Sequence, residues 1–153
     1  MTAESLMKRF SMTGHVENGA FVEKHYEHSG ADRAKSGLIY YYVAPDERTE
    51  FHVIDCDEYW CYSCGSTLEI WTADEAGELS VHLLGTEECC EPAVYLRSGL
   101  AFASKHPDGA AEGTFLSCIT VPRFSYEGFT LIPEKDMVEK CPAAAAFFGK
   151  KGE

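Results

Sequence analysis

The sequence lacks several features that would place the chain in a specialised class. No apolar run approaches the ~20 residues that a membrane-spanning helix needs. The N-terminal MTAESLMKRF has no apolar core of a secretory signal, so we expect a cytoplasmic protein. Basic residues are scarce: 13 Lys and Arg stand against 25 Asp and Glu, a net charge of −12. Nucleic acids and anionic membranes are therefore poor partners, because clustered basic side chains bind both.

The seven cysteines do not indicate a disulfide framework, because their number is odd and no secretion signal accompanies them. Cys61 and Cys64 have the spacing of a redox pair or of half a zinc site. They fall in a predicted strand, however, where side chains three positions apart point to opposite faces. The adjacent Cys89 and Cys90 lack the spacing of a second zinc pair. We expect the thiols to be reduced and to fill apolar space.

The order of elements predicts an all-β domain. A length of 153 residues suits a single domain spanning 1–153. An amphipathic helix is expected over 2–12, a β core over about 15–133 and a helical tail over 134–150. Many short strands with helices only at the ends favour a sandwich or barrel. The expected strands cover residues 20–26, 36–43, 49–54, 58–64, 67–72, 79–84, 93–96, 100–105, 114–121 and 129–132.

The stretch FHVIDCDEYWCYSCG, residues 51–65, carries most of the chemistry. His52 is followed by Glu58 and then by Gly65, with a turn between two predicted strands. This spacing resembles the first signature of the cupin superfamily, in which a His-x-His strand precedes a turn, a Glu opens the next strand and a Gly closes it. Ile54 stands in the place of the second His.

Further blocks resemble one branch, the small single-domain cupins of unassigned function called cupin-5. The matching blocks are HVENGAFVE from residue 15, GLIYYYV from residue 37, RSGLAF from residue 97 and FTL from residue 129. The resemblance runs from roughly residue 15 to 141. It implies a cupin jelly roll, the double-stranded β-helix, that encloses a cavity and is commonly a homodimer.

A metal cofactor is not expected. A catalytic cupin metal needs about three or four nitrogen or oxygen ligands that converge on one point. At the positions that the resemblance implies, His52 and Glu58 remain, whereas Ile54 and Phe102 are apolar. A weak divalent ion at His52 and Glu58 is the disfavoured alternative.

A ligand cavity is the preferred interpretation of the motif. Glu58, Trp60 and Tyr62 share one face of their strand by alternation. The resemblance implies that this face looks inward together with His52, and an apolar wall with a few polar groups is typical of small-molecule sites. The expected ligand-binding residues are Glu23, Ile54, Trp60, Tyr40 and Phe102.

Three functions remain open for such a cavity. The first is a metal-independent isomerase or epimerase that transfers a proton on a sugar-like or other polar metabolite, with His52 as general base, Glu58 or Glu23 orienting it and Tyr62 as the acid. The second is a non-catalytic ligand-binding or sensing module. The third is a metal-dependent oxygenase or lyase with a degenerate site. The fold alone does not choose among them.

Overall fold

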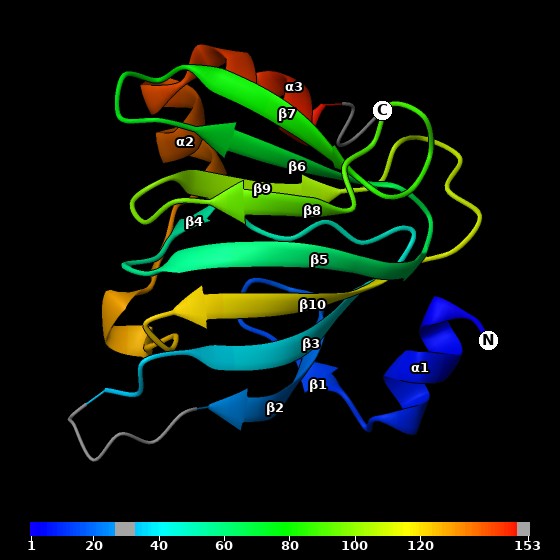
Figure 1. Ribbon diagram of the computed structural model, residues 1–153. Coiled ribbons are helices and arrows are strands. Elements are labelled where there is room, and N and C mark those ends of the chain that lie inside the picture. The colour runs from blue at the N-terminus through cyan, green and yellow to red at the C-terminus, as the bar shows by residue number, and fades with distance from the viewer. Residues whose placement is uncertain (27–32, 150–153) are drawn as a thin grey trace.

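Two antiparallel β-sheets face one another in the computed structural model, which describes residues 1–26 and 33–149 (Figure 1). The first sheet has the strand order β1-β2-β3-β10-β5-β8, and the second has the order β11-β4-β9-β6-β7. The strands are β1 (Thr13–Gly14), β2 (Ala20–Tyr26), β3 (Gly37–Val43), β4 (His52–Val53), β5 (Asp57–Gly65), β6 (Leu68–Ala73), β7 (Leu79–Leu84), β8 (Ala93–Leu96), β9 (Ala101–Lys105), β10 (Thr114–Val121) and β11 (Thr130–Leu131). This architecture confirms the predicted all-β sandwich.

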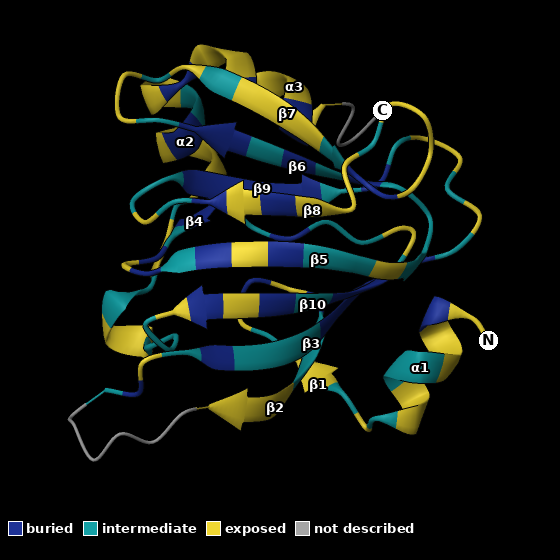
Figure 2. Cartoon of the chain, viewed as in Figure 1, coloured by how far each residue is buried: buried dark blue, intermediate teal, exposed yellow. Residues whose placement is uncertain are grey.

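Short helices flank the sheets on their outer faces. They are α1 (Ala3–Arg9), α2 (Glu134–Lys140) and α3 (Ala145–Phe148), with the 3-10 turn η2 (Pro142–Ala144) between the last two. A second 3-10 turn, η1 (Tyr126–Gly128), precedes β11. Helix α1 packs on the first sheet, and α2 and α3 pack on the second. Helix α1 buries Ala3 and partly buries Leu6 and Met7, while its remaining residues are exposed (Figure 2). Among the described residues, no helix has the length and apolar character needed to cross a membrane.

The main core lies between the sheets, and the two-residue period of the strands decides which side chains enter it. In β3, Tyr41 and Val43 belong to this core. Tyr40 and Tyr42 point to the other face, where Tyr40 lies 4.9 Å from the Phe10 ring beside α1. The second sheet buries Phe51 and Ala73 against the C-terminal helices in the same way.

Strand boundaries differ most from the prediction around His52. The expected strand over 49–54 is reduced to His52–Val53, because only these residues pair with both β9 and β11. Thr49 contacts Ser104 of β9 in another way: its N–H donates to the Ser104 carbonyl at 2.9 Å, and its hydroxyl accepts a hydrogen bond from the Ser104 N–H at 2.8 Å. Two short elements, β1 and η1, were not predicted. The predicted tail ends at residue 150, which lies outside the described residues.

Candidate functional site

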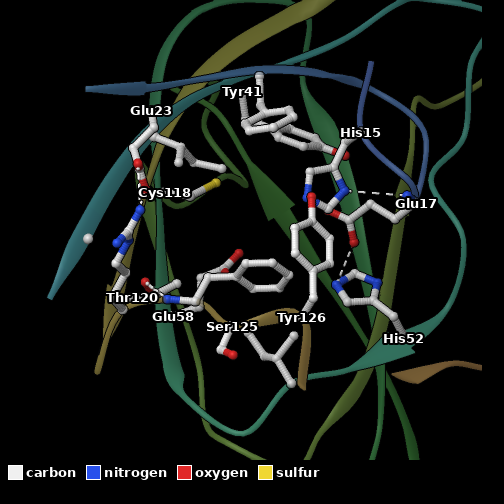
Figure 3. A pocket seen from close by; sticks show the side chains of 16 residues that line it. His15, Glu17, Glu23, Tyr41, His52, Glu58, Cys118, Thr120, Ser125 and Tyr126 are labelled. Carbon is white, nitrogen blue, oxygen red and sulfur yellow. Dashed lines mark hydrogen bonds and ion pairs between the residues drawn. The ribbon is translucent and has the colours of Figure 1, made fainter. Parts of the chain in front are cut away.

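A cavity of about 400 Å³ opens between the sheets at one end of the sandwich (Figure 3). Its walls come from the turn before β2, from strands β2, β3 and β10, from the β4–β5 region and from the segment that leads into η1. The lining residues are His15, Glu17, Phe21, Glu23, Gly37, Ile39, Tyr41, His52, Ile54, Glu58, Cys118, Thr120, Arg123, Phe124, Ser125 and Tyr126. Carboxyl, imidazole, thiol and hydroxyl side chains therefore line one cavity.

A tight turn places Glu17 in this cavity. Asn18 and Gly19 both adopt a φ of +77°, and the Glu17 carbonyl accepts a hydrogen bond from the Glu50 amide at 2.8 Å. A Cβ at Gly19 would lie 2.5 Å from the hydroxyl oxygen of Tyr41, so the position has room only for glycine. That hydroxyl donates a hydrogen bond to the Asn18 carbonyl at 2.5 Å. The turn therefore holds the Tyr41 side chain in position, and the Tyr41 hydroxyl in turn holds the backbone of the turn.

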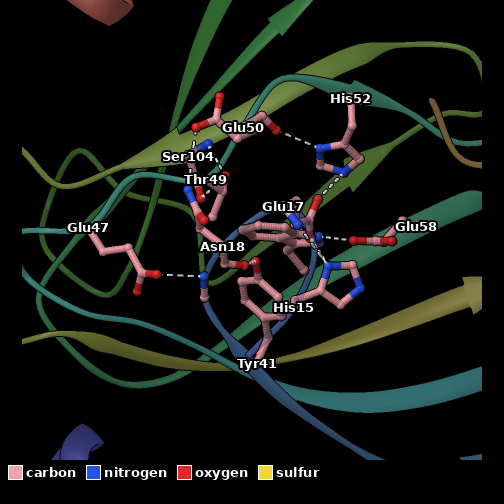
Figure 4. A network of polar contacts seen from close by, with 12 residues as sticks. His15, Glu17, Asn18, Tyr41, Glu47, Thr49, Glu50, His52, Glu58 and Ser104 are labelled. Carbon is pink, nitrogen blue, oxygen red and sulfur yellow. Dashed lines mark hydrogen bonds and ion pairs between the residues drawn. The ribbon is translucent and has the colours of Figure 1, made fainter. Parts of the chain in front are cut away.

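Glu17 and His52 form a buried ion pair, with Nε2 of His52 2.6 Å from Oε2 of Glu17 (Figure 4). The other ring nitrogen, Nδ1, is 2.8 Å from the carbonyl oxygen of Glu50 and donates a hydrogen bond to it, because a carbonyl oxygen can only accept. Burial lowers the pKa of His52, but the Glu17 carboxylate and the Glu50 carbonyl outweigh it and raise the pKa above the usual value. Burial likewise opposes the charge of Glu17, yet the two histidines lower its pKa. The charged form of the pair is therefore favoured.

Glu58 lies on the other side of the cavity, beside Cys118 and Thr120 (Figure 3). Its Oε1 accepts a hydrogen bond from the indole N–H of Trp60, two residues further along β5. Burial and, second, the nearby Glu17 carboxylate raise the pKa of Glu58 from 4.5 to about 7. The carboxyl group can therefore both donate and accept a proton near neutral pH.

Aromatic rings and an exposed ion pair complete the walls. Phe124 lies 5.0 Å from Tyr126, and the His15 ring lies 4.9 Å from Phe21. Tyr126 is 58% exposed, which places it at the mouth. Arg123 is also near solvent and holds both carboxylate oxygens of Glu23, at 3.1 and 2.7 Å.

The structure brings four of the predicted site residues to the cavity and leaves four outside its lining. His52, Glu58, Glu23 and Ile54 line it, whereas Trp60, Tyr62, Tyr40 and Phe102 do not. Trp60 and Tyr62 belong to the core beyond Glu58, and the Tyr62 hydroxyl donates to the Gly65 carbonyl at 2.6 Å.

Tyr40 and Phe102 are displaced from the cavity for other reasons. Tyr40 faces α1, so it is Tyr41 that contributes a ring to the lining. Phe102 packs behind His52, with ring centroids 4.2 Å apart. The prediction that these four side chains line the cavity is corrected accordingly.

The orienting partner of His52 is also corrected. Glu17 contacts His52, while Glu58 binds the Trp60 indole and Glu23 binds Arg123. The sequence offered a signal for Glu17, because it belongs to the same HVENG block as His15, but nothing in the block showed which strand it would face.

The donor set does not fit the three- or four-ligand metal site of metal-binding cupins. One nitrogen of His52 donates to a carbonyl and the other lies 2.6 Å from Glu17, so an ion at His52 would have to displace this ion pair. Ile54 occupies a ligand position and is apolar, and Phe102 lies outside the lining. The described residues contain no group of three His, Cys, Asp or Glu side chains arranged to hold an ion.

Comparison with known protein families identifies the family of the chain. The profile of the Cupin_5 family of the cupin superfamily (DUF985) matches residues 4–132, so the chain belongs to this family. This confirms the predicted resemblance and the cupin jelly roll. No curated protein matches the sequence significantly.

Solved structures share the fold. A protein from Shewanella oneidensis superposes with a TM-score of 0.87 at 23% identity, covering 95% of this chain and 94% of its own. A hypothetical protein from Leishmania major gives 0.84 at 23% identity, covering 95% and 96%. The L-ribose isomerase of Cellulomonas parahominis, solved with L-ribose, gives 0.61 at 10% identity, covering 82% and 74%. At these identities the likeness shows the fold alone.

Proposed function

We propose that this cupin binds a small polar metabolite in the cavity and isomerises or epimerises it by metal-independent proton transfer. The observation that carries the proposal is Glu58, a buried cavity carboxyl whose pKa is raised to about 7, facing the Glu17–His52 ion pair. A general acid–base works best when its pKa lies near the working pH.

Each polar group has a separate role in this proposal. Glu58 removes a proton from the substrate as the carboxylate and returns it as the acid. The ion pair of Glu17 and His52 orients the substrate and stabilises charge that develops on it, because fixed charges act strongly in a site that excludes water. His52 is not the base, since both of its ring nitrogens are engaged. Tyr62 has no part, because it lies outside the lining.

The isomerase among the solved structures supports the reaction class only as a precedent on the same fold. That enzyme was solved with L-ribose, and its identity to this chain is 10%. The argument for proton transfer therefore depends on the geometry of Glu58 and not on that likeness.

Deuterium incorporation tests the proposal directly. Purified protein is incubated with a filtered metabolite extract in heavy water, and mass spectrometry detects metabolites that gain one mass unit in a protein-dependent manner. We expect at least one such metabolite, and we expect Glu58→Gln to abolish its labelling. The matched control is Glu69→Gln, since Glu69 also accepts a hydrogen bond from an indole two residues ahead, that of Trp71 at 2.9 Å, but lies outside the cavity lining. Labelling that persists in Glu58→Gln, or no labelling at all, would refute the proton-transfer role.

A non-catalytic binding module is the second candidate. The engagement of both His52 nitrogens favours it, because His52 is then not available as an acid–base group. A binding module would show ligand-dependent melting with the same extract fractions and no deuterium gain.

A further inference from the structure

We infer that the ligand of this cavity carries a protonated amine, held between the carboxyl group of Glu58 and the aromatic wall. The inference rests on the proposed function, since it names the ligand class for the same cavity. It follows from how the charges that line the cavity are paired.

Both cationic groups of the lining are already committed. The guanidinium of Arg123 binds both oxygens of Glu23, and the imidazole of His52 lies 2.6 Å from Glu17. His15 has a lowered pKa because it is buried, so its ring is neutral at neutral pH. An anionic ligand would therefore find no free cation among the described lining residues and would meet three carboxyl groups.

Glu58 is the acidic group of the described lining for which no ion-pair contact is found, although the charge of His52 acts on it at longer range and favours its ionised form. Its contacts are the Trp60 indole N–H and the buried Cys118 beside it, which are both uncharged. Without a ligand the carboxyl group avoids the cost of a buried charge by keeping its proton near neutral pH. An ammonium group placed beside it would supply the missing counter-ion.

The aromatic wall suits the same chemistry. Phe21, Phe124 and Tyr126 line the cavity together with the buried Tyr41 ring. Ring faces attract cations through their quadrupole, and the attraction is larger where water is excluded. Neutral polyols gain little from such faces beyond apolar contact, so the rings add to the preference for an amine.

Binding of an ammonium ion should also release a proton. The ligand's charge stabilises the carboxylate of Glu58, so a carboxyl group that was protonated in the empty cavity ionises in the complex. This is consistent with the proposed reaction, because Glu58 then meets the substrate as a base, and an ammonium group makes a neighbouring C–H bond more acidic.

Three ring compounds of nearly equal shape test the inference: cyclohexylammonium, cyclohexanol and cyclohexanecarboxylate. Affinities are measured by calorimetry slightly below neutral pH in phosphate and in MOPS buffer, which differ in ionisation enthalpy and contain no primary ammonium group. We expect cyclohexylammonium to bind about tenfold tighter than cyclohexanol, a difference of about 1.4 kcal/mol, and the carboxylate to bind most weakly. Proton release appears as a binding enthalpy that differs between the two buffers for the amine alone.

Glu58→Gln should remove both the tenfold preference and the buffer dependence, while Glu69→Gln should keep them. Cyclohexanol or the carboxylate binding as tightly as the amine would overturn the inference and leave the proton-transfer proposal standing. Amine preference without deuterium exchange would sustain the inference and refute catalysis. Failure of all three compounds to bind at their solubility limits would overturn the inference and count against a ligand cavity.

Discussion

The raised pKa of Glu58 makes the stability of this protein depend on pH in a defined window. In the unfolded chain the carboxyl group titrates near 4.5, and in the folded protein near 7. Between these values the folded state holds more protons than the unfolded state, so the free energy of unfolding falls as the pH rises. The contribution of Glu58 is fully present below about pH 4.5 and is lost as the pH passes through about 7.

The size of this effect follows from the two pKa values. A difference from 4.5 to about 7, at about 1.4 kcal/mol for each pH unit, amounts to roughly 3 kcal/mol. Glu58→Gln removes the titrating group but retains an acceptor oxygen for the Trp60 indole. We therefore expect the variant to be less stable than, or similar to, the parent at about pH 5 and to gain roughly 3 kcal/mol relative to it by about pH 8.

Urea unfolding of both proteins at several pH values between these limits measures the difference. Glu69→Gln provides the control for removing a carboxyl group bound to an indole, because Glu69 is only partly buried and lies outside the cavity lining. Parallel curves for Glu58→Gln and the parent would show that Glu58 ionises normally in the fold, and the acid–base argument would fail with it.

Two further variants probe the turn and the ion pair. Glu17→Gln should lower the pKa of His52 below its usual 6.5, because burial then acts without the opposing carboxylate. The variant should also destabilise the fold by roughly 3 kcal/mol at neutral pH. NMR titration of the His52 ring measures the pKa, and an unchanged value would contradict the ion pair. Gly19→Ala should cost roughly 1–3 kcal/mol, since its φ of +77° disfavours a side chain and the new Cβ would meet the Tyr41 hydroxyl. Thermal melting measures the loss, and a variant as stable as the parent would show that the turn is not constrained by Tyr41.

Much of the fold could be predicted because β-branched and aromatic runs, bounded by turn residues, indicate strands from local sequence alone. The strands over 20–26, 79–84, 93–96 and 114–121 begin and end where their β-rich runs and turn residues placed them. The reduction of the strand around His52 could not be predicted, since it depends on which residues of β9 and β11 lie alongside.

The candidate site was predictable in part for the same reason. Alternation correctly assigned Glu58, Trp60 and Tyr62 to one face of β5, but alternation says nothing of depth along the strand. Whether a residue on that face lines the cavity or packs in the core depends on the side chains of the facing sheet, such as Phe102 near Trp60. The sequence also did not decide which face of β3 points to the core; in the structure Tyr41 points inward and Tyr40 faces α1.

The sequence by itself determined the all-β class, the net negative charge and the placement of His52 and Glu58 on consecutive strands, because these follow from residue type and short-range spacing. The jelly roll was predicted from the resemblance of several sequence blocks to the cupin family. Only the tertiary structure decided the chemistry of the cavity. It brought Glu17 across 35 positions of chain to His52, paired Arg123 with Glu23 and left Glu58 buried without a counter-ion. Charge pairing and burial depend on distances in space, and spacing along the chain does not encode them.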